Sequence, residues 1–190
     1  MKTSVILKKW NQLPKHPHQI LVKDACIIID LIELNLLRGF LTLNYDVITT
    51  SAVIIEITDL NQKNELEESL NSGKILVDDN GSLIDIMALQ AKYSGLSYAD
   101  ASVLEVALRK QVMLITADGL LRKAAVNENN TVHGTLWVIE TLHYNRIITV
   151  QTAIGKIKEL MQINKRISPE ICFTVIKRIE EEETTYHINK

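Results

Sequence analysis

The sequence predicts an α/β protein in which helices cover both faces of a parallel sheet. Strand-like and helix-like segments alternate along the chain, and this alternation is typical of parallel sheets. The segment "QVMLITAD" at 111–118 is as apolar as a strand in the centre of such a sheet should be. Only 7 Gly and 3 Pro occur among 190 residues, so long structureless loops are not expected.

In the first half of the chain, short apolar runs rich in β-branched residues are each followed by apolar residues at helical spacing. The predicted strands are 19–24, 45–50 and 74–79. The predicted helices are 25–40, 51–60 and 82–94. Thr50 or Ser51 is the expected N-cap of the helix at 51–60, because a hydroxyl oxygen accepts from the free N–H groups of a helix start.

The second half of the chain continues the alternation. The predicted strands are 111–118 and 131–134. One predicted helix begins at residue 96, before the strand at 111–118. The other predicted helices cover 119–127, 135–145, 152–164 and 168–183. Pro169 is well placed in the first turn of the last helix, where its missing N–H costs no hydrogen bond.

The pattern divides the chain into three parts. Residues 1–18 form an N-terminal extension, residues 19–180 carry the α/β pattern of one domain, and residues 181–190 form an acidic C-terminal tail. The acidic run from Glu180 to Glu183 is expected to be a solvated helix end that leads into this tail.

Net charge, cysteine content and the length of apolar runs limit the class of protein. The formal net charge of -2 neither indicates nor excludes a nucleic-acid partner, because a local patch matters more than the sum. Cys26 and Cys172 are far apart and lack metal-ligand spacing, which favours a reducing cytoplasm. No apolar run reaches about 18 residues, so no membrane span is expected. The N-terminus lacks the order of a signal peptide.

One acid lies on the buried side of its own helix. In "LSYADASVLEVAL", Asp100 precedes Val103, Leu104 and Ala107 by three, four and seven residues. These spacings place all four residues on one helix face. A carboxylate directed toward a core needs a partner there, so Asp100 is a candidate functional residue.

Three further acids stand at the ends of predicted elements. Asp24 closes the first predicted strand, Asp118 closes the strand at 111–118, and Glu56 lies in the helix after "YDVITT". Parallel sheets bind their ligands at the carboxyl ends of their strands, so these acids and Asp100 are expected to converge.

A cluster of carboxylates predicts a bound cation. Two unit charges about 4 Å apart repel by roughly 1 kcal/mol in water and about 4 kcal/mol at a surface-like dielectric. A divalent ion removes this repulsion, and a set of oxygen ligands favours Mg²⁺ or Mn²⁺ over zinc.

Each acid except Asp24 also has an ordinary structural explanation. Ser97-x-x-Asp100 is a capping-box pattern, Asp118 is a candidate N-cap, and Glu56 fits a solvated helix face. Asp24 is harder to explain in this way, since it ends an apolar strand.

Other charged pairs are interpreted as surface features. Asp78 and Asp79 also follow a predicted strand, but the "NGS" after them indicates a surface turn. Arg109 and Lys110, like Arg122 and Lys123, follow a motif segment and are candidates for the border of a substrate groove, although basic residues at helix ends are common without function.

At these residues the sequence resembles the PIN-domain family of metal-dependent nucleases. "LVKDACIIIDLIE" and "VITTSAVIIEI" resemble its first two motifs, with Asp24 and Glu56 as the acids. "GLSYADASVLEVAL" is similar to the third motif, with Asp100. "LITADGLLRKAA" is similar to the fourth, with Thr116 and Asp118. The order and spacing of the motifs hold from about residue 20 to 145.

The resemblance implies a three-layer α/β/α sandwich around a five-stranded parallel sheet. It also implies a hydrolase that cleaves phosphodiesters, usually in RNA, with Mg²⁺ or Mn²⁺. Asp24, Glu56, Asp100 and Asp118 would hold one or two ions, and Thr116 would be a supporting hydroxyl. Many bacterial and archaeal members are VapC-like toxins, so the implied partners are an RNA substrate, a small antitoxin protein and a second copy in a homodimer.

The first motif departs from the family pattern at one position. Two residues after the first Asp the family commonly has Ser, Thr or Asn, and this chain has Cys26. A thiol is a poor hydrogen-bond partner and a poor Mg²⁺ ligand, so we expect Cys26 to weaken the site or to shift its metal preference.

Other functions are weighed against the nuclease. The domain could be a catalytically weak RNA-binding or protein-interaction module that kept the acids. A phosphoacceptor domain is disfavoured, because it needs paired acids near the first strand and a Lys after a late strand. "VKDA" holds a single Asp and "VHGT" holds no Lys.

Overall fold

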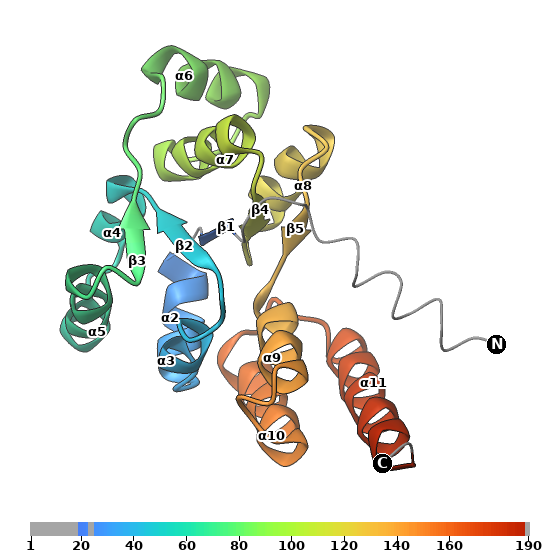
Figure 1. Cartoon of the computed structure of the whole chain (residues 1–190). Coiled ribbons are helices and arrows are strands. Elements are labelled where there is room, and N and C mark those ends of the chain that lie inside the picture. The colour runs from blue at the N-terminus through green and yellow to red at the C-terminus, as the bar shows by residue number, and fades with distance from the viewer. Residues whose placement is uncertain (1–18, 23–24, 189–190) are drawn as a thin grey trace.

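The structure is a computed structural model that describes residues 19–22 and 25–188. These residues form a five-stranded, fully parallel sheet with helices on both faces (Figure 1). The strands are β1 (Gln19–Val22), β2 (Asp46–Thr49), β3 (Ile75–Val77), β4 (Met113–Ile115) and β5 (Val132–His133). The predicted α/β/α sandwich around a small parallel sheet is confirmed.

The strand order creates a topological switch point beside β1. The order is β3-β2-β1-β4-β5, so the chain moves outward from β1 to β3 and then returns to add β4 on the other side. Leu21 in β1 lies opposite Ile48 in β2 and Leu114 in β4. Ligands of open α/β sheets bind in the crevice where the strand order reverses, which here lies at the carboxyl ends of β1 and β4.

Two groups of helices cover the sheet (Figure 1). On one side, α7 packs on β1 and β4, and it lies between α6 and α8. On the other side, α2 contacts α5 and α9, and α10 and α11 pack against α9. The helices before β4 are α2 (Ala25–Glu33), α3 (Leu37–Phe40), α4 (Ser51–Glu56), α5 (Leu60–Asn71), α6 (Leu83–Lys92) and α7 (Tyr98–Lys110). The helices after β4 are α8 (Gly119–Asn127), α9 (Thr135–Tyr144), α10 (Val150–Ile163) and α11 (Pro169–Ile188).

Helix α7 is the central helix of its layer, because its residues from Ala99 to Ala107 are all buried. Small residues such as Ala101 and Ala107 let its backbone approach the sheet and the neighbouring helices closely. Ser102 and Glu105 are buried on the same helix and have polar partners. A helix that is buried on nearly every side holds its polar groups in defined positions.

Two predicted helices are interrupted. The helix expected over 25–40 divides into α2 and α3 at Asn35, which adopts a left-handed conformation with φ of 53°. Asn tolerates this region better than most residues. The helix expected over 51–60 ends at Glu56, and Asp59 caps a new helix, α5, by accepting from the N–H groups of Asn61 and Gln62. Helix α5 was not predicted as a separate helix, because only Leu66 and Ser69 of it are buried and its apolar pattern is weak.

The C-terminal helix is longer than expected. Residues 181–188, predicted as the start of an acidic tail, continue α11 as far as Ile188. Glu183 accepts from Arg146 at 2.6 Å, and this contact attaches the acidic run to the end of α9. The predicted N-terminal extension, residues 1–18, lies outside the described residues. Across residues 19–22 and 25–188, no helix has the length and apolar character that a membrane span requires.

Candidate functional site

Three of the four predicted acids, Glu56, Asp100 and Asp118, stand around the carboxyl edge of the sheet. Asp118 follows β4 and begins α8, while Glu56 ends α4, the short helix after β2. Asp100 lies in the first turn of α7, the helix that leads into β4. Asp24 follows β1 in the sequence and lies outside the described residues.

Asp100 is held by a complete capping box. Its Oδ2 accepts from the backbone N–H of Ser97 at 2.9 Å, and its own N–H donates to Ser97 Oγ at 3.0 Å. Asp100 as a whole residue is only 8% exposed. The predicted capping role is therefore correct, and the predicted inward direction is correct as well. The box fixes the carboxylate in one orientation at the edge of the sheet.

Asp118 and Thr116 form a second fixed unit at the end of β4. Asp118 Oδ1 accepts from the N–H of Leu121 at 2.8 Å and so caps α8. The N–H of Asp118 donates to the buried hydroxyl of Thr116 at 2.9 Å. Among the described residues, nothing donates a hydrogen bond to the second oxygen of Asp118, Oδ2. Within the described part of the chain, one oxygen of this carboxylate therefore has no donor.

Arg122 stabilises the backbone at the carboxyl ends of β4 and β5, next to Thr116 and Asp118. Its Nη2 donates to the carbonyl oxygen of Thr116, just after β4, at 2.7 Å and to that of His133, the last residue of β5, at 2.9 Å. Burial lowers the pKa of the Arg122 guanidinium, and burial together with the Arg122 charge lowers the pKa of His133 to about 4. His133 is therefore neutral at pH 7, and its ring stacks on Trp137 with the ring centroids 4.4 Å apart.

A cleft lies beside Glu56. Its volume is about 560 Å³, and it opens between the ends of β2 and β3 and the starts of α6 and α7. Polar side chains on its wall are Thr50, Ser51, Glu56, Asp78, Asp79, Ser97, Tyr98 and Ser102. Because Ser97 also holds Asp100, the cleft adjoins the capping box.

The donor set suits a hard divalent cation, although the described residues do not complete the site. Among residues 19–22 and 25–188, no three acidic, histidine or cysteine side chains lie close enough to hold one metal ion. Glu56, Asp100 and Asp118 alone therefore do not make the predicted cluster, and the four-carboxylate set that includes Asp24 stays a prediction. Carboxylate oxygens are the ligands that Mg²⁺ and Mn²⁺ prefer, and among the described residues one oxygen of Asp118 has no donor.

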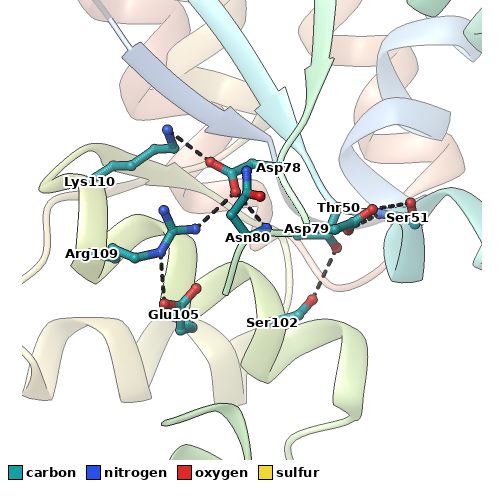
Figure 2. A network of polar contacts seen from close by, with 9 residues as sticks. All are labelled: Thr50, Ser51, Asp78, Asp79, Asn80, Ser102, Glu105, Arg109 and Lys110. Carbon is teal, nitrogen blue, oxygen red and sulfur yellow. Dashed lines mark hydrogen bonds and ion pairs between the residues drawn. The ribbon is translucent and has the colours of Figure 1, made fainter. Parts of the chain in front are cut away.

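A network of polar contacts in this region involves residues that the sequence interpretation placed at a surface turn (Figure 2). Asp78 is buried and forms ion pairs with Arg109 at 2.9 Å and Lys110 at 2.8 Å. Burial alone would raise the pKa of the Asp78 carboxyl. Hydrogen bonds from Lys110, the N–H of Asn80 and Arg109 outweigh burial and lower the pKa to about 2.

The neighbouring acid, Asp79, has a different environment. It is exposed on the cleft wall and accepts from the N–H of Ser51 at 2.9 Å and from the Ser51 hydroxyl (Figure 2). Thr50 Oγ1 and Ser102 Oγ, 3.0 Å apart, form a hydrogen bond deeper in the wall. The rule that selected Asp24 and Asp118, an acid just after a parallel strand, also selects Asp78 and Asp79. Setting them aside as a surface turn was wrong for Asp78.

Glu105 completes the network beneath Gly81. Its Oε1 accepts from Arg109 Nε at 2.8 Å, while its buried Oε2 has no hydrogen-bond partner among the described residues. A Cβ added to Gly81 would lie 2.5 Å from this Oε2. Gly81 is therefore needed for close approach of the chain to a buried carboxylate.

Replacing Gly81 with Ala is expected to destabilise the protein by about 1–2 kcal/mol, because the new methyl group displaces Glu105 from Arg109. Urea unfolding measures this change. Gly155→Ala is the matched control, since nothing lies within 4 Å of an added Cβ there and Ala favours the α10 helix by about 1 kcal/mol. Equal stability of Gly81→Ala and wild type would show that Glu105 moves without cost.

The fold and the acids at the carboxyl edge of its sheet define a three-layer α/β protein with a candidate hydrolytic site. The family model described as a PIN domain matches residues 20–181, and the chain belongs to this family. No curated protein matches the chain closely enough to count as a relative. PIN domains are commonly nucleases that use divalent metals, so membership supports a hydrolase in general.

Proposed function

We propose that the protein is an endoribonuclease that hydrolyses RNA phosphodiesters with Mg²⁺ or Mn²⁺, held by Asp24, Glu56, Asp100 and Asp118. The main support is the cleft at the carboxyl edge of the sheet, which Glu56 lines and which Ser97 connects to Asp100. Family membership supports the same reaction class. The toxin role, with an antitoxin and a second copy as partners, stays a prediction, and so does a cytoplasmic location.

In this proposal the chain orients its carboxylates before substrate arrives. The capping box holds Asp100, the Leu121 N–H holds Asp118, and Thr116 fixes the backbone of Asp118. Activation of a water and neutralisation of the leaving oxygen are the chemistry that one or two bound divalent ions supply in such sites. Preorganised carboxylates lower the cost of assembling the site during each turnover.

The test is cleavage of unstructured RNA by the purified full chain in Mg²⁺, in Mn²⁺ and in EDTA. We expect cleavage with either metal, loss of cleavage in EDTA, and recovery when metal is added in excess. Gel analysis of end-labelled RNA reports internal cuts. Cleavage that persists in EDTA would contradict the metal-dependent reaction. Tight RNA binding without cleavage at millimolar metal would favour the RNA-binding module instead.

A further inference from the structure

We propose that the cleft beside Glu56 is a subsite that binds a guanine base of the substrate RNA, with Asp79 as the residue that selects guanine. This inference rests on the proposed RNA cleavage and deepens it. The cleft volume of about 560 Å³ lies within the range of sites that bind small ligands.

Exposed apolar side chains give the cleft a surface for a flat base. Ile55, Leu83 and Tyr98 line it, and they are 77%, 59% and 49% exposed. Proteins that bind single-stranded RNA stack unpaired bases on aromatic side chains, and Tyr98 is the aromatic side chain of this group. Such stacking contributes about 1–3 kcal/mol per base and accepts every base. Selection among bases therefore requires a polar group on the wall.

Asp79 is the polar group best placed for this selection. The adjacent Asp78 also lines the cleft, but it is buried and forms ion pairs with both nearby cations, Arg109 and Lys110. Asp79 has only neutral donors from Ser51 and, among the described residues, no cationic partner. Its charge therefore stays uncompensated on the cleft wall, while Ser51 holds both carboxylate oxygens in place.

A fixed carboxylate discriminates between bases by its hydrogen-bonding capacity. An ionised carboxylate only accepts hydrogen bonds, through two oxygens side by side. Guanine presents two adjacent donors, N1–H and N2–H, on its Watson–Crick edge. Adenine and cytosine present one amino group beside an acceptor nitrogen, and uracil presents one N–H between two carbonyl groups. The negative wall also repels phosphate, so the base is the part of a nucleotide that enters.

The position of the cleft fits a subsite of the proposed nuclease. Glu56, one of the proposed metal-binding acids, forms part of its wall, and Ser97 connects it to Asp100. A guanine bound here lies next to the acids at the edge of the sheet. Recognition would then select a phosphodiester close to a guanine.

The experiment measures binding of two fluorescently labelled hexaribonucleotides, UUUGUU and UUUAUU, by anisotropy in EDTA. No RNA is cut under this condition, so the result does not depend on nuclease activity. We expect the wild-type chain to bind the guanine oligonucleotide about tenfold more tightly. Asp79→Asn keeps an oxygen for the Ser51 N–H but presents an amide in place of the second oxygen, and it should bind the two oligonucleotides equally.

Asp59→Asn is the matched control. Asp59 is also an exposed carboxylate that accepts backbone hydrogen bonds, because it caps α5 through the N–H groups of Asn61 and Gln62. Unlike Asp79, it does not line the cleft. Its variant should keep the tenfold preference. Equal binding of both oligonucleotides by wild type, or binding of neither, would overturn the guanine subsite. So would an Asp79→Asn variant that folds and keeps the preference. If the chain still cleaves RNA in a metal-dependent reaction, any of these results would contradict the guanine subsite and not the proposed nuclease.

Discussion

Asp100→Asn is expected to lower kcat/KM for RNA cleavage by about 10³-fold while the fold is retained. This loss corresponds to about 4 kcal/mol of transition-state stabilisation, at 1.36 kcal/mol for each factor of ten. The physical reason is that a neutral amide binds a divalent cation far more weakly than a carboxylate. The amide oxygen of Asn still accepts from the Ser97 N–H, so the helix cap is mostly kept.

Asp85→Asn is the matched control for this substitution. Asp85 stands three residues after the capping Ser82 of α6, and its N–H donates to Ser82 Oγ at 3.3 Å, as the N–H of Asp100 does to Ser97. Asp85 is exposed and does not line the cleft. Asp85→Asn should therefore cut RNA at the wild-type rate. Thermal unfolding of both variants separates loss of chemistry from loss of fold.

The effect of a bound metal on thermal stability is an independent test of the role of Asp100. A ligand that binds only the native state stabilises it by about 2.7 kcal/mol at a hundredfold excess over its Kd. Mn²⁺ should raise the Tm of wild type and Asp85→Asn, and this rise should be reduced in Asp100→Asn. If Asp100→Asn cuts RNA like wild type, Asp100 is only a capping residue and the proposed metal set is wrong.

Arg178→Ala is expected to destabilise the protein by about 3 kcal/mol. Glu140, whose side chain is 5% exposed, accepts from Arg178 Nε at 2.6 Å, and this ion pair joins α9 to α11. Removing the Arg leaves a buried carboxylate without its cation, which costs about 3–5 kcal/mol in buried pairs. We use the low end because the Arg178 side chain is 45% exposed, so water partly screens the pair.

Thermal unfolding measures this effect as a fall in Tm of about 6–12 °C for a domain of this size. Lys177→Ala, at the preceding position of α11, is the control, because its ion pair with Glu181 is long, 3.8 Å, and exposed. It should change stability by less than about 0.5 kcal/mol. Adding Glu140→Gln to Arg178→Ala should recover part of the loss, since no charge then stays buried. Absence of recovery would contradict the unpaired-charge explanation.

The Arg178→Ala effect should also depend on pH. Burial raises the pKa of Glu140 in the folded state, while Arg178 opposes this rise. A folded-state pKa above the unfolded value means that the folded state binds more protons between the two values, so stability falls as pH rises through that window. Without Arg178 the pKa of Glu140 rises further. The destabilisation should therefore be smaller at pH 5 than at pH 8.

Much of the fold was predictable from local pattern, as three elements illustrate. The β4 strand and the helix α7 were predicted because their apolar residues are dense and regular. Helix α5 was not predicted as its own helix, because it buries only Leu66 and Ser69 and its start depends on the Asp59 cap. Helices and strands with a broad buried face can therefore be predicted from the apolar pattern of the sequence, and helices stabilised mainly by their caps cannot.

The sequence alone determined where the acids can stand. Asp100 and Asp118 were expected at helix starts, and both cap helices in the structure. Periodicity places Asp100 on the inner face of α7, because residues three, four and seven apart share one side of a helix. Membership of the PIN-domain family agrees with this order of motifs.

Only the tertiary structure decided the different environments of Asp78 and Asp79. They are neighbours after the same strand and both line the cleft, yet Asp78 is buried and pairs with two cations, while Asp79 is exposed and accepts from Ser51 (Figure 2). Arg109 reaches Asp78 from 31 residues away, on a helix whose position is set by packing between the sheet, α6 and α8. Local sequence specifies how a residue points from its own backbone. The partner that its side chain meets depends on which distant elements pack beside it, because burial and charge compensation arise from long-range contacts.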